Sequence, residues 1–291
     1  MKMSTQNVID YYEKNWPMFV KLWQVDKTYC IHYGYYEKGV HSHIQSVYNM
    51  NDFIDRLLEL RLKQGETKSV LDAGSGIGGT VVHLAKKYPS IDFTGITVIP
   101  HHVQMAEQFA TENHVSSNTR FFIKDYLDTD FPSNYFDAIF SIEAINYTSK
   151  GREFVHEMQR ILKPRGKLVV IDAFRTDVQL NQFLNTFYIW FCKGRSIPGL
   201  MGIEEFKTLL KEGGFTEIED KNLSNNVQRS VIRGNLMSIP YLLSTVLKKI
   251  IRGRKYLAAN DPSFPTAVSI FSSLIGLKKG VTYNAIIATK K

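Results

Sequence analysis

Cysteine is almost absent from this chain, because Cys30 and Cys192 are the only two among 291 residues. They lie far apart in the sequence, which excludes a disulfide framework and a zinc site of paired cysteines, so we expect no metal centre. So few cysteines are typical of a reducing compartment. The N-terminal segment also lacks the apolar core of a signal peptide, and we therefore expect a cytoplasmic location.

Long hydrophobic runs and nucleic-acid-binding motifs are absent as well. The longest apolar run, near residues 264–277, contains Pro265 and is too short to span a bilayer. The formal net charge of +8 permits an anionic partner, but the basic residues are not interleaved with aromatic ones, so we expect no nucleic-acid partner. The cluster of Lys248, Lys249, Arg252, Arg254 and Lys255 is either a solvated surface or a site that attracts an anionic acceptor or a membrane.

An alternation of strand and helix patterns dominates the middle of the chain. Strand patterns at 69–73, 92–96, 120–123, 136–142 and 167–172 alternate with helix patterns at 80–88, 100–113 and 152–162. Such alternation predicts an α/β fold with a doubly wound, mostly parallel sheet. We assign residues 1–66 to an aromatic helical cap, 67–175 to a nucleotide-binding core and 176–291 to the rest of the sheet, within one compact domain.

The C-terminal third departs from this alternation. Helices are predicted over 178–192 and 203–212, a sixth strand over 215–219 and a seventh over 281–289. A helical insertion between the last two strands would lie over the carboxyl ends of the sheet, where folds of this kind bind ligands. We therefore predict that this insertion is a lid over the substrate.

The segment S-V-L-D-A-G-S-G-I-G-G-T at residues 69–80 places four glycines directly after a buried strand. Glycine allows a ligand to approach the backbone, and the amides of the following helix favour polar or anionic groups. The spacing of Gly74, Gly76 and Gly79 matches a dinucleotide site, which also requires an acid about 20 residues later. The second strand instead ends at Thr97 with no acid.

The acid stands at Asp72, two residues before the first glycine. A carboxylate there would repel a pyrophosphate but would attract an ammonium group. The pattern V-L-D-x-G-x-G-x-G resembles the first motif of the class I S-adenosylmethionine (AdoMet) methyltransferases. With I-H-Y-G-Y-Y-E-K-G-V at 31–40, F-D-A-I-F-S-I-E-A-I-N-Y at 136–147 and I-L-K-P-R-G-K-L-V-V-I-D at 161–172, nearly the whole chain resembles the sterol C-methyltransferase, tocopherol methyltransferase and cyclopropane-fatty-acid synthase group.

This resemblance implies a Rossmann-like fold that binds AdoMet and releases S-adenosylhomocysteine. Asp72 would order the ammonium group of the cofactor, while Gly74 and Gly76 would let the backbone approach it. Asp125, after the third strand, would accept the adenine amino hydrogen, and Tyr126 would offer a backbone amide or a ring edge.

The ribose of the cofactor has a less certain partner in this sequence. Methyltransferases commonly place an acid after the second strand for the ribose hydroxyls, whereas this chain has Thr97. The resembling group has a glutamine five residues beyond its threonine. His102 occupies that position here with Gln104 nearby, and either could hydrogen-bond a hydroxyl group. Thr97 and His102 become the candidate ribose-side residues.

Three further residues are candidates for work on the acceptor. Glu143 follows an apolar strand, and in the resembling enzymes an acid in this region lies near the reacting centre, where it stabilises a cation, removes a proton or orients the substrate. Relatives often carry histidines shortly afterwards, but this chain has Asn146 and Tyr147. Tyr147 and His32 are therefore the other catalytic candidates.

Aromatic residues are abundant in the cap and in residues 183–191. They suit an apolar or amphipathic small-molecule acceptor, isoprenoid or lipid-like, because aromatic faces stabilise the cation that forms when an alkene is methylated. They equally suit methylation on oxygen or nitrogen. Peripheral membrane contact, an anionic acceptor, and a monomeric or homo-oligomeric state all stay open. The alternatives to a methyltransferase are an NAD-dependent oxidoreductase and a non-catalytic AdoMet-binding module.

Overall fold

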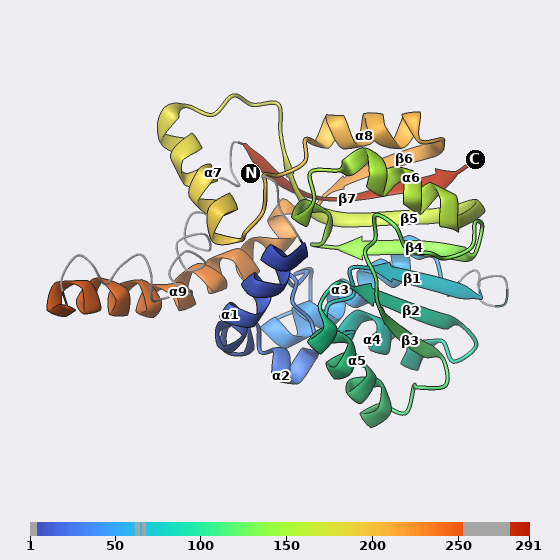
Figure 1. Cartoon of the computed structure of the whole chain (residues 1–291), viewed down its shortest axis with the longest axis horizontal. Helices are drawn as coiled ribbons and strands as arrows, with labels where there is room; N and C mark the ends of the chain where they lie inside the picture. The colour runs from blue at the N-terminus through green and yellow to red at the C-terminus, as the bar shows by residue number, and fades with distance from the viewer. Residues whose placement is uncertain (1–4, 62–64, 66–67, 253–279) are drawn as a thin grey trace.

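A seven-stranded sheet forms the centre of the protein in a computed structural model that describes residues 5–61, 65, 68–252 and 280–291 (Figure 1). Its order is β3-β2-β1-β4-β5-β7-β6, and β7 alone runs antiparallel to its neighbours. The strands are β1 (Ser69–Ala73), β2 (Asp92–Thr97), β3 (Thr119–Ile123), β4 (Phe136–Ile142), β5 (Leu162–Arg175), β6 (Phe215–Asn222) and β7 (Val281–Lys290). The predicted doubly wound, mostly parallel sheet is confirmed.

Helices cover both faces of this sheet and one of its ends. They are α1 (Thr5–Trp23), α2 (Val25–Thr28), α3 (His43–Leu58), α4 (Gly79–Lys87), α5 (Pro100–Glu112), α6 (Gly151–Ile161), α7 (Gln182–Gly194), α8 (Ile203–Glu212), α9 (Ser224–Arg252) and the short 3-10 helix η1 (Ile145–Tyr147). Helices α1, α7 and α9 lie together at the left end of the sheet in Figure 1.

Two hydrophobic cores form because successive strand residues point to opposite faces of the sheet. In β1, Val70 packs in the core that also contains residues of α3, α4 and α5, whereas Leu71 packs in the core beneath α6 and α8. In β4, Phe140 packs in the first of these cores and Ile139 packs in the second. Strands that are buried on both faces read as continuous apolar runs, which is why β1 and β4 have the bounds that the sequence predicts.

The N-terminal cap closes over the carboxyl ends of the strands. Helix α3 begins at a capping box in which the Ser42 side chain accepts a hydrogen bond from the Gln45 amide. The loop between α2 and α3 contacts the core directly, because the Gly79 amide donates to the Tyr29 carbonyl at 2.9 Å. A Cβ atom on Gly79 would lie 2.2 Å from that carbonyl oxygen, so only glycine permits the contact.

One C-terminal helix differs from the prediction. Helix α7 begins at Gln182 rather than at residue 178, because the Asn181 side chain caps it by accepting from the Leu184 amide. Helix α9 lies in the predicted insertion, and its described residues pack against the cap, where Ser230 donates to the Gly34 carbonyl and accepts from the Gly34 amide. The function of the insertion as a lid stays a prediction. The rest of the insertion, residues 253–279, is outside the described part of the chain.

The described helices include none with the length and apolar character that a membrane span needs.

Candidate active site

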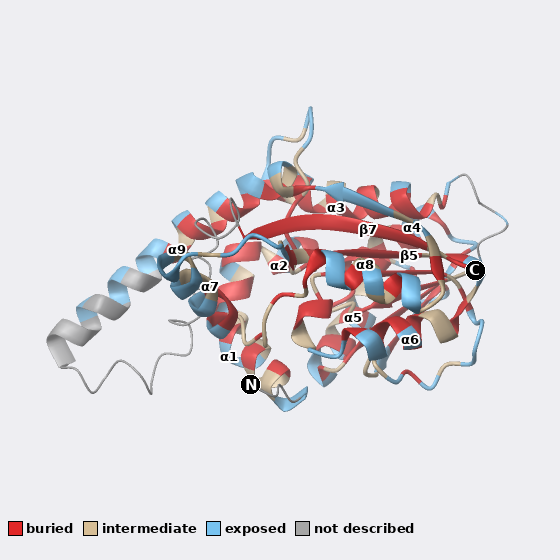
Figure 2. Cartoon of the chain, turned by 90° about the horizontal axis from the view of Figure 1, so that it is seen from above, coloured by how far each residue is buried: buried red, intermediate tan, exposed pale blue. Residues whose placement is uncertain are grey.

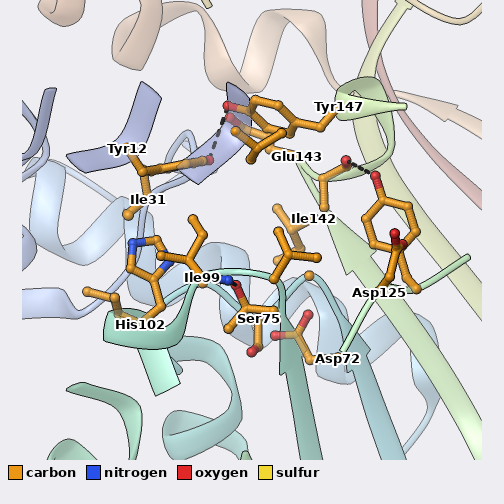
Figure 3. Close-up of a pocket in the computed structure, with 18 of the residues that line it drawn as sticks. Tyr12, Ile31, Asp72, Ser75, Ile99, His102, Asp125, Ile142, Glu143 and Tyr147 are labelled. Carbon is orange, nitrogen blue, oxygen red and sulfur yellow. Dashed lines mark hydrogen bonds between the residues drawn. The ribbon is translucent and has the colours of Figure 1, made fainter. Parts of the chain in front are cut away.

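A cavity of about 590 Å³ lies where the carboxyl ends of β1, β2, β3 and β4 meet the N-terminal cap. Its volume is that of a pocket for a small organic ligand. All ten residues that the sequence analysis selected line this one cavity: His32, Asp72, Gly74, Gly76, Thr97, His102, Asp125, Tyr126, Glu143 and Tyr147. Figure 3 shows Asp72 on one side of the cavity and Tyr12, Glu143 and Tyr147 on the opposite side.

The glycine turn lies along one wall and has the backbone that its composition predicts. Gly74 has a φ of +116°, and a Cβ atom there would lie 2.4 Å from the Cβ of Ala144. Gly76 has a φ of +51°, but no protein atom lies within 4 Å of its missing Cβ. Gly74 therefore permits close packing of β1 against β4, whereas Gly76 leaves room for a ligand.

Asp72 is a buried acid that has no hydrogen-bond donor among the described residues. Its side chain is only 3% exposed. Burial raises the pKa of Asp72 to about 8, an effect that the charge of His32 partly offsets. An unpartnered, buried carboxyl group at the wall of a cavity is costly unless a ligand provides the missing partner. An ammonium group is the cation that would do so.

His102 and Thr97 lie near the start of α5. Thr97 accepts a hydrogen bond from the Ile99 amide at 3.3 Å, and His102 is only 2% exposed. Burial, followed by the charge of His101, lowers the pKa of His102 to about 4, so the ring is neutral. Its Nδ1 atom has no partner among the described residues. A neutral imidazole fits the predicted role of hydrogen bonding to a hydroxyl group.

Asp125 and Tyr126 follow β3 and form the adjoining wall. One Asp125 oxygen accepts from the Leu127 amide at 2.9 Å, which holds the turn in place. The Tyr126 hydroxyl donates to the Ala144 carbonyl at 3.1 Å, so its ring is fixed against the loop after β4. Both residues are therefore rigid in the wall where an adenine ring is predicted to lie.

Glu143 is held more firmly than any other candidate for work on the acceptor. Its Oε1 atom accepts from the Tyr33 amide at 2.7 Å and from the Tyr283 hydroxyl at 2.8 Å. Burial raises the pKa of Tyr283 well above its usual range, so the hydroxyl keeps its proton and donates it. Glu143 also has a φ of +48°. A non-glycine residue in this region is uncommon and is often found at functional sites.

His32 has both ring nitrogens engaged by the protein. Nδ1 lies 3.0 Å from the Tyr33 carbonyl and Nε2 lies 3.1 Å from Oδ1 of Asn51. Burial alone would lower the pKa of His32, but the charge of Cys30, hydrogen bonding to Cys30 and to the Tyr33 carbonyl, and the charge of Glu143 raise it to about 9. A catalytic role for His32 stays a prediction, and its contacts support a positioning role beside Asp72.

Tyr147 separates the cavity from a second, smaller one, which we call the inner chamber. Tyr12 donates a hydrogen bond to the Tyr147 hydroxyl at 3.1 Å, and this pair spans the boundary (Figure 3). Four residues line both spaces: Tyr12, Ile31, Glu143 and Tyr147. The remaining lining of the inner chamber comes from Tyr11, Phe19, Trp23, Asn146, Asp172, Ala173, Phe191, Arg195, Ile197 and Leu200.

The comparisons with known proteins identify the family. A family model described as a methyltransferase domain matches residues 70–166. Ajmaline N-methyltransferase of Rauvolfia serpentina is 26% identical over 210 residues, which are 66% of this chain and 70% of the relative. This chain belongs to the class I AdoMet-dependent methyltransferases. The sterol 24-C-methyltransferase of Neurospora crassa is 26% identical to this methyltransferase over 198 residues, which are 67% of the chain and 51% of the relative.

The methyltransferase therefore spans between about half and 70% of the length of these two relatives. A cyclopropane synthase of Mycobacterium tuberculosis has the same fold, with a TM-score of 0.77 at 16% identity, over 100% of this chain and 99% of the other. The family membership decides between the two interpretations of the glycine turn in favour of AdoMet. The partnerless carboxyl group of Asp72 and the open space at Gly76 fit the cofactor.

We expect AdoMet or S-adenosylhomocysteine to expel a proton from Asp72 on binding. At pH 7 most of the ligand-free protein has Asp72 protonated, because its pKa is about 8, whereas the ligand's ammonium group favours the carboxylate. Affinity should therefore rise with pH between about 6 and 8. Calorimetry with S-adenosylhomocysteine at pH 7, in two buffers that differ in ionisation enthalpy, measures the released protons. Heats that do not depend on the buffer would contradict this assignment.

The sequence analysis missed several residues of the site. Asp172 ends an apolar run in β5 just as Asp72 and Glu143 follow theirs, so this pattern could have identified it. Arg195 and Tyr283 had no such signal, because helix packing and the antiparallel pairing of β7 bring them to the site from distant parts of the chain.

Proposed function

We propose that this methyltransferase transfers the methyl group of AdoMet to an apolar or amphipathic small molecule, such as an isoprenoid, a lipid or another natural product. The observation that carries the proposal is the pair of adjoining spaces: a cavity of about 590 Å³ that contains the predicted cofactor residues, and a smaller inner chamber with several aromatic side chains in its walls, with Glu143 and Tyr147 lining both. The similarity to an ajmaline N-methyltransferase and a sterol 24-C-methyltransferase supports an acceptor with a large apolar part.

The protein's own contribution is alignment and the exclusion of water. AdoMet supplies an electrophilic methyl group on a sulfonium sulfur. Methyl transfer needs the acceptor atom in line with that group, so the boundary between the two spaces is where the acceptor atom would lie. Tyr12, Tyr147 and Ile31 enclose this boundary with rings and methyl groups, which keeps water away from the reacting centre.

Glu143 is the charged group at this boundary. If carbon is methylated, an electron-poor centre forms, and the carboxylate would stabilise it or accept the proton that is then lost. If oxygen or nitrogen is methylated, Glu143 would orient the acceptor. In both cases the Tyr33 amide and the Tyr283 hydroxyl hold one carboxylate oxygen and leave the other for the acceptor.

Contact with a membrane surface stays a prediction that the apolar surface of two helices supports. Figure 2 shows exposed positions along α7 and α9. The large apolar side chains at such positions are Phe183, Ile189, Trp190, Ile232, Leu236, Ile239, Leu243 and Leu247. The basic cluster begins at the end of α9, beyond the last described side chain, and Arg254 and Lys255 lie outside the described residues.

We expect methyl-labelled AdoMet to transfer its label to organic-soluble products. The purified protein would be incubated with a panel of isoprenoid alcohols, phenols, sterols and unsaturated lipids, and with peptides and nucleic acid for comparison. Extraction and mass analysis then identify the acceptor and the methylated atom. Label found only on peptides or nucleic acid, with the lipid-like panel unlabelled, would contradict the proposal.

A further inference from the structure

Two side chains that line the inner chamber each contain a buried polar atom without a partner among the described residues. Asp172 is 4% exposed, and its Oδ2 atom has no hydrogen-bond partner among the described residues. The same holds for Nε of Arg195. Unpaired buried polar atoms are rare in folded proteins and are costly, so each requires an explanation. Because both atoms belong to side chains that line one chamber, a single ligand group would explain both.

Asp172 is held so that one oxygen stays available. Its Oδ1 atom accepts from Nδ2 of Asn146 at 2.7 Å and from the Ala173 amide at 2.7 Å. Asn146 is itself fixed, because its Oδ1 accepts from the Met201 amide. Burial and the charge of Glu143 raise the pKa of Asp172 to about 7. A hydrogen-bond donor from a ligand would offset the free-energy cost of burying the unpaired Oδ2 atom of Asp172.

Arg195 directly follows the last residue of α7, and its side chain lines the inner chamber. Its Nη2 atom donates to the Tyr33 hydroxyl at 2.6 Å, and the guanidinium carbon lies 4.9 Å from the centre of the Phe191 ring. The described residues place no carboxylate oxygen within 4.0 Å of its nitrogens. Arg195 is thus a fixed cation, stacked on rings, that faces Asp172 and Glu143 without a salt bridge to either.

We propose that Asp172 and Arg195 form a subsite for a neutral hydroxyl group of the acceptor. A hydroxyl donates one hydrogen bond and accepts others, so it would donate to Asp172 and accept from Arg195. A carboxylate or an ionised phosphate has no proton to donate to Asp172, and an ammonium group has no lone pair to accept from Arg195. The chamber volume of about 50 Å³ holds one small polar group. This inference rests on the proposed function and narrows its substrate class.

The test uses two probes that differ only in the hydroxyl group, p-cresol and toluene, whose rings would lie in the larger cavity at its boundary with the inner chamber, so that only the hydroxyl group enters the chamber. Their affinities for the full chain would be measured by ligand-observed NMR titration, with S-adenosylhomocysteine at saturation. We expect the wild-type protein to prefer p-cresol by at least 10-fold. Asp172→Asn and Arg195→Gln should each reduce this preference at least 5-fold and leave toluene binding unchanged. Asp177→Asn and Lys193→Gln remove exposed charges near the same two positions and should keep the preference.

If the wild-type protein binds the two probes with equal affinity, the proposed subsite is wrong, whatever the variants do. An unchanged preference in both chamber variants would also contradict it. Arg195→Lys, which keeps the charge but lacks the Nε donor, should lose part of the preference even if Arg195→Gln does not fold. Failure of S-adenosylhomocysteine to bind would count against the proposed function instead, and the same probe pair on ligand-free protein would still decide the subsite.

Discussion

A Gly76→Val variant is expected to lose cofactor binding while its core stays folded. The missing Cβ of Gly76 has no protein atom within 4 Å and lies at the wall of the larger cavity, so the valine side chain would fill space that the cofactor needs. Inserting methyl groups where a ligand must pack costs about 1–3 kcal/mol, and more where nothing can move aside. We expect the affinity for S-adenosylhomocysteine, measured by calorimetry, to fall on the order of 100-fold.

The matched control for this variant is Gly39→Val. Gly39 has a φ of +90°, has no atom within 4 Å of its missing Cβ, and does not line the larger cavity. Both substitutions therefore impose a side chain on a left-handed backbone, at a cost of about 1–3 kcal/mol in stability. Thermal melting should fall by similar amounts in the two variants, whereas only Gly76→Val should lose binding. Normal affinity in folded Gly76→Val would mean that the turn does not contact the cofactor.

Features with a local cause in the sequence were predictable. Strands β1 and β4 and helix α8 have the bounds that their apolar patterns indicate. The cofactor-side residues were predictable for the same reason, because parallel strands end at one edge and each strand delivers its next polar residue there. Asp72 and Asp125 reach the same cavity although 52 positions separate them in the sequence.

Features that depend on distant pairing were not predictable. Strand β5 was expected at 167–172 but runs from Leu162 to Arg175. Its first residue pairs with Phe136 of β4, and its last residues pair with β7, which lies more than 100 positions further along the chain. The inner chamber has the same origin. Its walls come from α1, from the loop after α2, from the loop after β4, from β5 and from the end of α7 with the segment that follows it, and no local pattern shows that these five segments meet.

We expect the second large effect from Glu143→Gln, which should lower the rate of methyl transfer on the order of 10²–10⁴-fold with little change in cofactor affinity. In this structure the substitution removes the negative charge of Glu143 and keeps its hydrogen bonds. The glutamine oxygen can still accept from the Tyr33 amide and the Tyr283 hydroxyl, so the side chain keeps its place. The measurements are single-turnover methyl transfer, with an acceptor found in the labelled screen, and calorimetric affinity for S-adenosylhomocysteine on the same sample.

Tyr283→Phe is the matched control, because it removes one of the two hydrogen bonds to Glu143 and keeps the charge. If Glu143 acts mainly through its orientation, Tyr283→Phe should lower the rate of methyl transfer about as much as Glu143→Gln does. If the charge acts on the acceptor, Glu143→Gln should lose far more. Wild-type turnover by folded Glu143→Gln would remove this residue from the catalytic group, and a loss of cofactor binding would place its carboxylate against the sulfonium instead.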